Sequence, residues 1–161
     1  MISSLATYVP PKLVTNADLE KVVEVTDARI RERTGIRERH VVDRGSATSD
    51  LAKEAAEKAI ERAGLLPDDI GLIIVGTSDA GHDVSEYGVF TSSEDRRQHS
   101  WGFDLSAACS AFTYAITTAS QMVATGAHDH ALVVGADVMS SIIDSRIDRL
   151  ACCSGMVLGQ S

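Results

Sequence analysis

The chain has 161 residues, enough for one domain of ordinary size. Apolar residues make up 44% and charged residues 24%, proportions that are normal for a globular protein. The formal net charge of −8 argues against nucleic acid or an anionic membrane surface as the main partner. We therefore expect a folded protein that binds no nucleic acid and that holds an anionic ligand only at a local basic patch.

We expect neither a membrane-spanning nor an exported segment in this sequence. No stretch is apolar for the roughly 20 residues that a membrane span requires. The N-terminus lacks a basic region followed by a long apolar run, so we expect no signal peptide. The three cysteines, including the adjacent Cys152 and Cys153, lack metal-ligand spacing. A cytoplasmic protein without a metal site is the expectation.

The first elements are short. Ile2–Tyr8 is predicted to be a strand that ends before two prolines. Thr15 is predicted to cap a helix, with Asp18 three residues later in a near capping box. The apolar residues within Leu19–Val23 are expected to form the buried face of that helix.

The next helices have clear ends. A short helix is expected over Asp27–Arg33 and stops at Gly35, and residues 36–42 are expected to be extended. The clearest helix runs from about Thr48 to Ala63, with Gly64 as its C-cap. Its predicted buried stripe consists of Leu51, Ala52, Ala55, Ala56, Ala59 and Ile60.

The second half of the chain alternates buried strands with a helix. The apolar runs Leu72–Thr77 and Ala131–Asp137 predict strands that are buried on both faces. Gly102–Leu105 predicts another strand, and a helix is expected from about Cys109 to Thr125, before Gly126. This alternation predicts an α/β fold with a mostly parallel sheet and helices on its faces.

Cys109 is the candidate nucleophile. It follows a predicted buried strand, at the predicted start of a helix and among small residues. The free N–H groups of a first helical turn favour the thiolate, which is the nucleophilic form of cysteine. Local features also allow a buried structural cysteine. By themselves they favour this alternative, because free cysteines are so often buried.

Five segments together resemble beta-ketoacyl-acyl-carrier-protein synthase III. They are YVPPKLVTNADLEK (Tyr8–Lys21), RTGIRERH (Arg33–His40), IGLIIVGT (Ile70–Thr77), FDLSAACSAFTYA (Phe103–Ala115) and ALVVGADV (Ala131–Val138). They occur in the order and at the spacing of that family. The resemblance implies the thiolase-like fold, in which two similar α/β halves pack as five layers (αβαβα) and the enzyme is a homodimer. Residues 1–161 resemble the N-terminal half.

The resemblance also implies a function. In the family a cysteine takes an acyl group from acyl-CoA, and the enzyme condenses that group with malonyl-acyl-carrier protein, releasing CO2. Cys109 stands at the position of the acylated nucleophile, and the resemblance implies that its backbone N–H forms half of an oxyanion hole. Arg33 and Arg149 match arginines that contact the CoA donor, with a solvated surface arginine as the alternative for each. The implied substrates are acyl-CoA and the acyl-carrier protein, with no cofactor.

The sequence departs from the family pattern at several positions. Arg29 stands where the family has a tryptophan that stacks on CoA, which makes a carrier-bound acyl donor or a related condensing enzyme an alternative. Ala111 stands where the family usually has glycine. The catalytic His and Asn of the family belong to the second half, and none of the five histidines present matches that His. We therefore expect this chain to be inactive in the full condensation.

Residues 83–101 and 150–161 do not fit the family pattern. Back-translated one base out of frame, the last residues permit the glycine-rich motif that the family has after Arg149. Residues 83–89 in a shifted frame permit the family's run of Phe, Pro and Ser followed by Ala and Cys. We hypothesise that both segments are frame-shifted relative to an ancestral gene, a hypothesis that the coding DNA would decide.

Three functions stay open from the sequence. The first is an acyltransferase fragment that carries Cys109 as nucleophile. The second is a non-catalytic interaction protein that keeps half of a thiolase fold. The third is half of another thiolase-fold enzyme, of the polyketide or hydroxymethylglutaryl-CoA type. Labelling of Cys109 by an acyl-CoA separates the first two.

Overall fold

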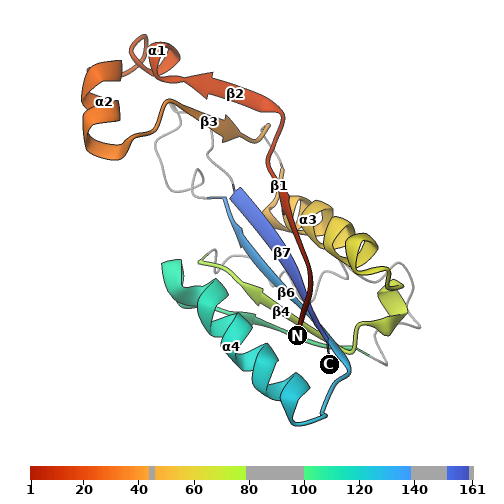
Figure 1. Cartoon of the computed structure of the whole chain (residues 1–161). Coiled ribbons are helices and arrows are strands. Elements are labelled where there is room, and N and C mark those ends of the chain that lie inside the picture. Colours follow the sequence, from red (N-terminus) through yellow and green to blue (C-terminus); the bar gives the residue numbers. More distant parts are fainter. Residues whose placement is uncertain (44–45, 79–99, 139–151, 160–161) are drawn as a thin grey trace.

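The computed structural model describes residues 1–43, 46–78, 100–138 and 152–159. The elements in chain order are β1 (Ile2–Tyr8), β2 (Lys12–Thr15), α1 (Asn16–Leu19), α2 (Asp27–Thr34), β3 (Glu38–Val41), α3 (Thr48–Ala63), η1 (Pro67–Asp69), β4 (Leu72–Gly76), β5 (Trp101–Leu105), η3 (Ala108–Ser110), α4 (Ala111–Ala124), β6 (His130–Asp137) and β7 (Cys152–Gly159). Figure 1 shows their arrangement. The atypical residues 83–99 lie outside the described ranges.

The central sheet has five strands in the order β1-β7-β6-β4-β5. β4 pairs in parallel with β5 and with β6, whereas β7 is antiparallel to both β6 and β1. Because β7 is antiparallel to both of its neighbours, β1 runs in the same direction as β6, β4 and β5. Four of the five strands therefore share one direction, which confirms the predicted mostly parallel sheet, and β7 alone runs the other way. Hydrophobic runs report that a strand is buried, but they do not report its direction.

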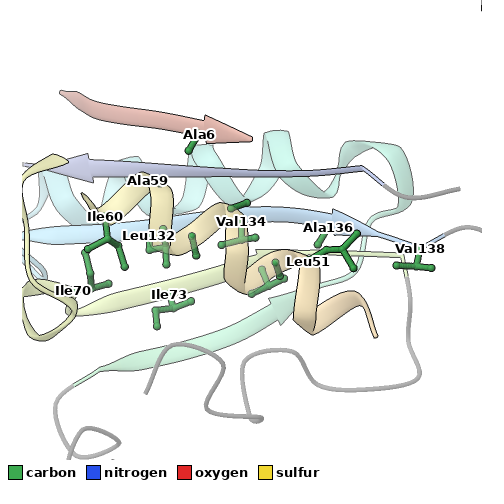
Figure 2. Close-up of a cluster of buried hydrophobic side chains, with 14 of the residues drawn as sticks. Ala6, Leu51, Ala59, Ile60, Ile70, Ile73, Leu132, Val134, Ala136 and Val138 are labelled. Carbon is green, nitrogen blue, oxygen red and sulfur yellow. The ribbon is translucent and has the colours of Figure 1, made fainter. Parts of the chain in front are cut away.

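Helices cover both faces of this sheet, as predicted. α3 packs on one face, where Figure 2 shows Ala59 close to Leu132 and Val134 of β6. α4 packs on the other face through a cluster that includes Ala115, Ala119, Leu72, Ile74, Ala131, Val133 and Met156. The side chains of β4 and β6 alternate between the two clusters, because neighbouring residues of a strand point to opposite faces.

Most predicted boundaries are confirmed. β1 has the predicted range, and α2 ends at Gly35, whose φ of 72° gives a left-handed C-cap. α3 spans Thr48–Ala63, and all six predicted stripe residues are buried. α1 is shorter than predicted: it ends at Leu19, and Val22 beyond it is 56% exposed. The capping box of Thr15 and Asp18 is present, but it begins only a single turn.

A smaller unit lies beside the main sheet. β2 and β3 form an antiparallel pair, and α1 and α2 lie between these two strands in the chain (Figure 1). The side chain of Asn16, which is 1% exposed, joins these elements. Its Nδ2 donates to Asp27 Oδ1 (2.7 Å) and to the Ile36 carbonyl (2.9 Å), and its Oδ1 accepts from Arg39 Nη2 (2.6 Å).

β7 is formed by residues of the segment 150–161, which the sequence analysis predicted to be atypical. It lies between β1 and β6 and pairs with both, and Met156 is 4% exposed between the sheet and α4. Residues 152–159 therefore complete the sheet, whatever reading frame encodes them. The frame-shift hypothesis stays a prediction about the coding DNA.

Candidate functional site

Cys109 lies in the η3 turn between β5 and α4, and its side chain is exposed. Because β4, β5 and β6 run parallel, their carboxyl ends meet at one edge of the sheet, and the turn follows that edge. In Figure 1 the start of α4 lies beside the arrowhead of β4. Ligands of open α/β sheets bind at such edges. The Cys109 thiol is therefore accessible to a reactant at the carboxyl ends of the parallel strands, where ligands of such folds bind.

The backbone just before Cys109 is strained. Ala108 has a φ of 46°, the positive-φ conformation that residues other than glycine seldom adopt. For an L-residue this conformation costs roughly 1–2 kcal/mol. Strain of this kind persists only where surrounding contacts hold it, and it is concentrated at functional sites. The turn that carries Cys109 is therefore held in shape by its neighbours.

The helix after Cys109 begins later than predicted. The prediction placed Cys109 in the first turn of an α-helix, whereas α4 begins at Ala111 and Ser110 is its N-cap. The positive φ of Ala108 turns the chain into η3 first, so Cys109 precedes the helix by two residues. The sequence shows no glycine or proline here that would have indicated this turn.

A polar network at the same edge was missed by the sequence analysis. Asp137, at the end of β6, accepts hydrogen bonds at Oδ1 from the Ser78 backbone N–H (2.7 Å) and the Ser78 hydroxyl (2.6 Å). The Thr77 hydroxyl lies 3.4 Å from the same oxygen. These bonds tie the residues that follow β4 to the end of β6. An acidic residue directly after a buried apolar run was the available signal.

The candidate donor-binding arginines are placed only in part. Arg33 lies in the last turn of α2 and is exposed, and Arg29 lies on the same helix and is also exposed. Arg149 lies outside the described residues. The proposed contacts of Arg33 and Arg149 with CoA stay predictions.

The histidines that the structure describes have structural partners. His40 Nδ1 lies 2.6 Å from the Pro10 carbonyl oxygen, His130 Nδ1 lies 3.3 Å from that of Asp69, and the His128 ring packs edge-on against Trp101. Within the described ranges, no group of three or more His, Cys, Asp or Glu side chains could hold a metal ion. No helix in the same ranges is long and apolar enough to cross a membrane.

Comparisons with known proteins give a consistent result. The family model of 3-oxoacyl-[acyl-carrier-protein] synthase III matches residues 103–156, which include the Cys109 turn. Beta-ketoacyl-[acyl-carrier-protein] synthase III of Koribacter versatilis is 44% identical over 157 residues, an alignment that covers 94% of this chain. The chain is related to beta-ketoacyl-[acyl-carrier-protein] synthase III. The alignment covers 45% of the Koribacter synthase III, so the chain spans about half the length of such relatives.

The structural comparisons confirm the thiolase-like fold class. The crystal structure of the synthase III from Aquifex aeolicus matches with a TM-score of 0.86 and 30% identity, covering 99% of this chain and 53% of that one. The priming beta-ketosynthase of the R1128 polyketide pathway also matches with a TM-score of 0.86, at 27% identity, covering 99% of this chain and 49% of that one. The fold is therefore that of half a synthase III, an architecture that a polyketide enzyme shares.

Proposed function

We propose that Cys109 accepts an acyl group as a thioester, and that this chain is the nucleophile-bearing part of a synthase III that starts type II fatty-acid synthesis. The observation that carries the proposal is the exposed Cys109 in a strained turn at the carboxyl ends of three parallel strands. The family match over residues 103–156 supports the same role. The exposure of Cys109 argues against the alternative of a buried structural cysteine.

The proposed step is an acyl transfer between two sulfur atoms. The Cys109 thiolate attacks the carbonyl carbon of an acyl thioester, and the tetrahedral oxyanion is stabilised by backbone N–H groups, that of Cys109 among them. The carbon–sulfur bond to the donor then breaks, and the donor thiolate leaves and takes up a proton. The result is an acyl-Cys109 thioester, which the full synthase would condense with malonyl-acyl-carrier protein in the cytoplasm. No cofactor is needed for this step.

Two classes of acyl donor are compatible with the sequence around α2. Arg33 and Arg149 are proposed to contact the CoA part of acyl-CoA, since paired cations favour an anionic donor. Arg29 stands in place of a stacking tryptophan, which favours a carrier-bound acyl group as a second candidate. The match to a polyketide priming synthase keeps that chemistry open as well. The rate of Cys109 acylation by acyl-CoA, compared with the rate with the same acyl group loaded on the carrier protein at equal concentration, separates these donors.

The test is mass spectrometry of the intact chain after incubation with each donor. We expect one added acyl group, located on Cys109 by peptide mapping and released by hydroxylamine, as a thioester requires. Cys109→Ser should lose the modification, whereas substitution of both Cys152 and Cys153 by Ser should keep it. An unmodified chain with every donor, or labelling at Cys152 or Cys153 only, would overturn the proposal in favour of a non-catalytic interaction protein.

A further inference from the structure

Two glycines face the start of α4 from neighbouring strands. Gly76 of β4 and Gly135 of β6 are partners in the sheet register. Neither adopts the left-handed backbone conformation that would by itself require glycine. Their significance is therefore the space that the absent side chains leave, and that space lies on the face of the sheet where α4 packs.

The first residues of α4 fill this space. A Cβ at Gly76 would lie 2.7 Å from the Ala111 carbonyl carbon and 2.7 Å from the Phe112 nitrogen. A Cβ at Gly135 would lie 2.8 Å from Phe112 Cδ2. These separations are shorter than van der Waals contact allows. A methyl group at Gly76 would therefore displace the backbone at the start of the helix, and one at Gly135 would displace the Phe112 side chain, which is carried by the same turn.

The displaced residues adjoin the candidate nucleophile. Ala111 is two residues after Cys109, and the strained Ala108 immediately precedes Cys109. Strain at Ala108 persists only if contacts before and after the turn hold it in place. After the turn, these contacts are the packing of Ala111 and Phe112 of α4 directly against Gly76 and Gly135. Thr77 N–H donates to the Leu105 carbonyl (3.2 Å), which fixes the strand side.

We propose that Gly76 and Gly135 are positioning residues that hold the Cys109 turn in its reactive shape by seating the first turn of α4 directly on the sheet. The inference rests on the proposed thioester chemistry of Cys109. The two glycines differ in a testable way. Gly135 faces the Phe112 side chain, and Phe112→Ala removes the two nearest ring contacts and keeps only the Cβ at 3.2 Å, whereas Gly76 faces backbone atoms, which no substitution can remove.

The experiment compares Gly135→Ala and Gly76→Ala in the full chain, each with and without Phe112→Ala. Thioester formation at Cys109 is measured against donor concentration. We expect each glycine variant to lower the maximal rate at least tenfold while the half-saturating donor concentration stays within twofold. Phe112→Ala should restore Gly135→Ala to within threefold of Phe112→Ala alone, and it should not restore Gly76→Ala. The matched control is Gly71→Ala, whose Cβ would meet a His128 side-chain nitrogen at 3.1 Å and should leave the rate unchanged.

The double variant and the amide resonance of Cys109 provide two further measurements. If Gly135→Ala alone does not fold, the double variant compared with Phe112→Ala carries the test, and a tenfold difference between them would overturn the inference. Equal rates in Gly135→Ala, Gly76→Ala and Gly71→Ala would also overturn it. The amide resonance of Cys109 should shift in Gly135→Ala and return in the double variant, even if no donor acylates the native chain. If the resonance shifts in this way but no donor acylates the native chain, the proposed function is rejected, and the positioning role of Gly76 and Gly135 is still supported.

Discussion

Asn16 is the residue whose side chain joins most elements of the smaller unit, through three hydrogen bonds to α2, β3 and the segment between them. Asn16→Ala removes all three hydrogen bonds at a side chain that is 1% exposed, and its partners Asp27 and Arg39 are half-buried. We expect a loss of about 2–3 kcal/mol in the free energy of unfolding. Urea denaturation measures it, with the exposed Gln121→Ala as a control that should change stability by less than about 0.5 kcal/mol. A loss equal to that of the control would contradict this role.

Asp18 makes the start of α1 dependent on pH. The Lys21 ammonium group and then the Thr15 hydroxyl and N–H donate to its carboxylate, and they hold the pKa of Asp18 well below its ordinary value. Because the pKa is lower in the folded than in the unfolded chain, the stabilisation is present above the unfolded value and is lost as the pH falls through the folded one.

The titration of Asp18 tests this assignment. We expect its carboxyl carbon resonance to titrate at a lower pH than that of an ordinary aspartate, and Lys21→Ala to raise the midpoint. The control is Lys53→Ala, since Lys53 pairs with Glu57 on α3 and should leave the Asp18 midpoint unchanged. Equal midpoints in the native chain and Lys21→Ala would show that the Lys21 ammonium group does not lower the pKa of Asp18.

At the scale of the elements, the end of α3 depends on one glycine. Gly64 has a φ of 69°, and a Cβ there would have no atom within 4 Å. Gly64→Ala therefore introduces backbone strain without a steric clash, and we expect a loss of about 1–2 kcal/mol. Gly64→Asn should cost less, because asparagine tolerates the left-handed conformation better. Thermal unfolding measures both, and an unchanged melting temperature in Gly64→Ala would contradict the expectation.

α3 and α4 differ in what their outer faces carry. α3 places Lys53 and Glu57, and Glu54 and Lys58, in i,i+4 pairs on its exposed face. No charged residue occurs in α4, and Tyr114 on it is 55% exposed. An uncharged helix of this kind suits a layered αβαβα architecture, in which a further layer covers α4.

At the scale of the whole molecule, β5 lies at one end of the sheet order and exposes apolar side chains. Trp101 is 69% and Phe103 is 39% exposed. An edge strand with exposed apolar residues favours pairing with another chain. The family resemblance implied a homodimer, and we expect any self-association of this chain to use β5.

Sedimentation of charged variants tests that surface. Phe103→Lys should lower the self-association constant at least tenfold, because lysine at an edge opposes strand pairing. The matched control is Leu5→Lys on β1 at the opposite edge, where Leu5 is 55% exposed, and it should leave the constant unchanged. A monomer at every concentration, or equal effects of the two variants, would contradict this role of β5.

The sequence by itself determined the bounds of α3, the bounds of α2, β4, β5 and β6 to within one residue, and the place of Cys109 after β5. These features depend on local periodicity, caps and chain order. Only the tertiary structure decided that β7 enters antiparallel between β1 and β6, that Ala108 adopts a positive φ, and that Gly76 and Gly135 seat α4. Strand direction, backbone strain and close approach all depend on which distant residues meet, and hydrophobic patterning along the chain does not contain that information.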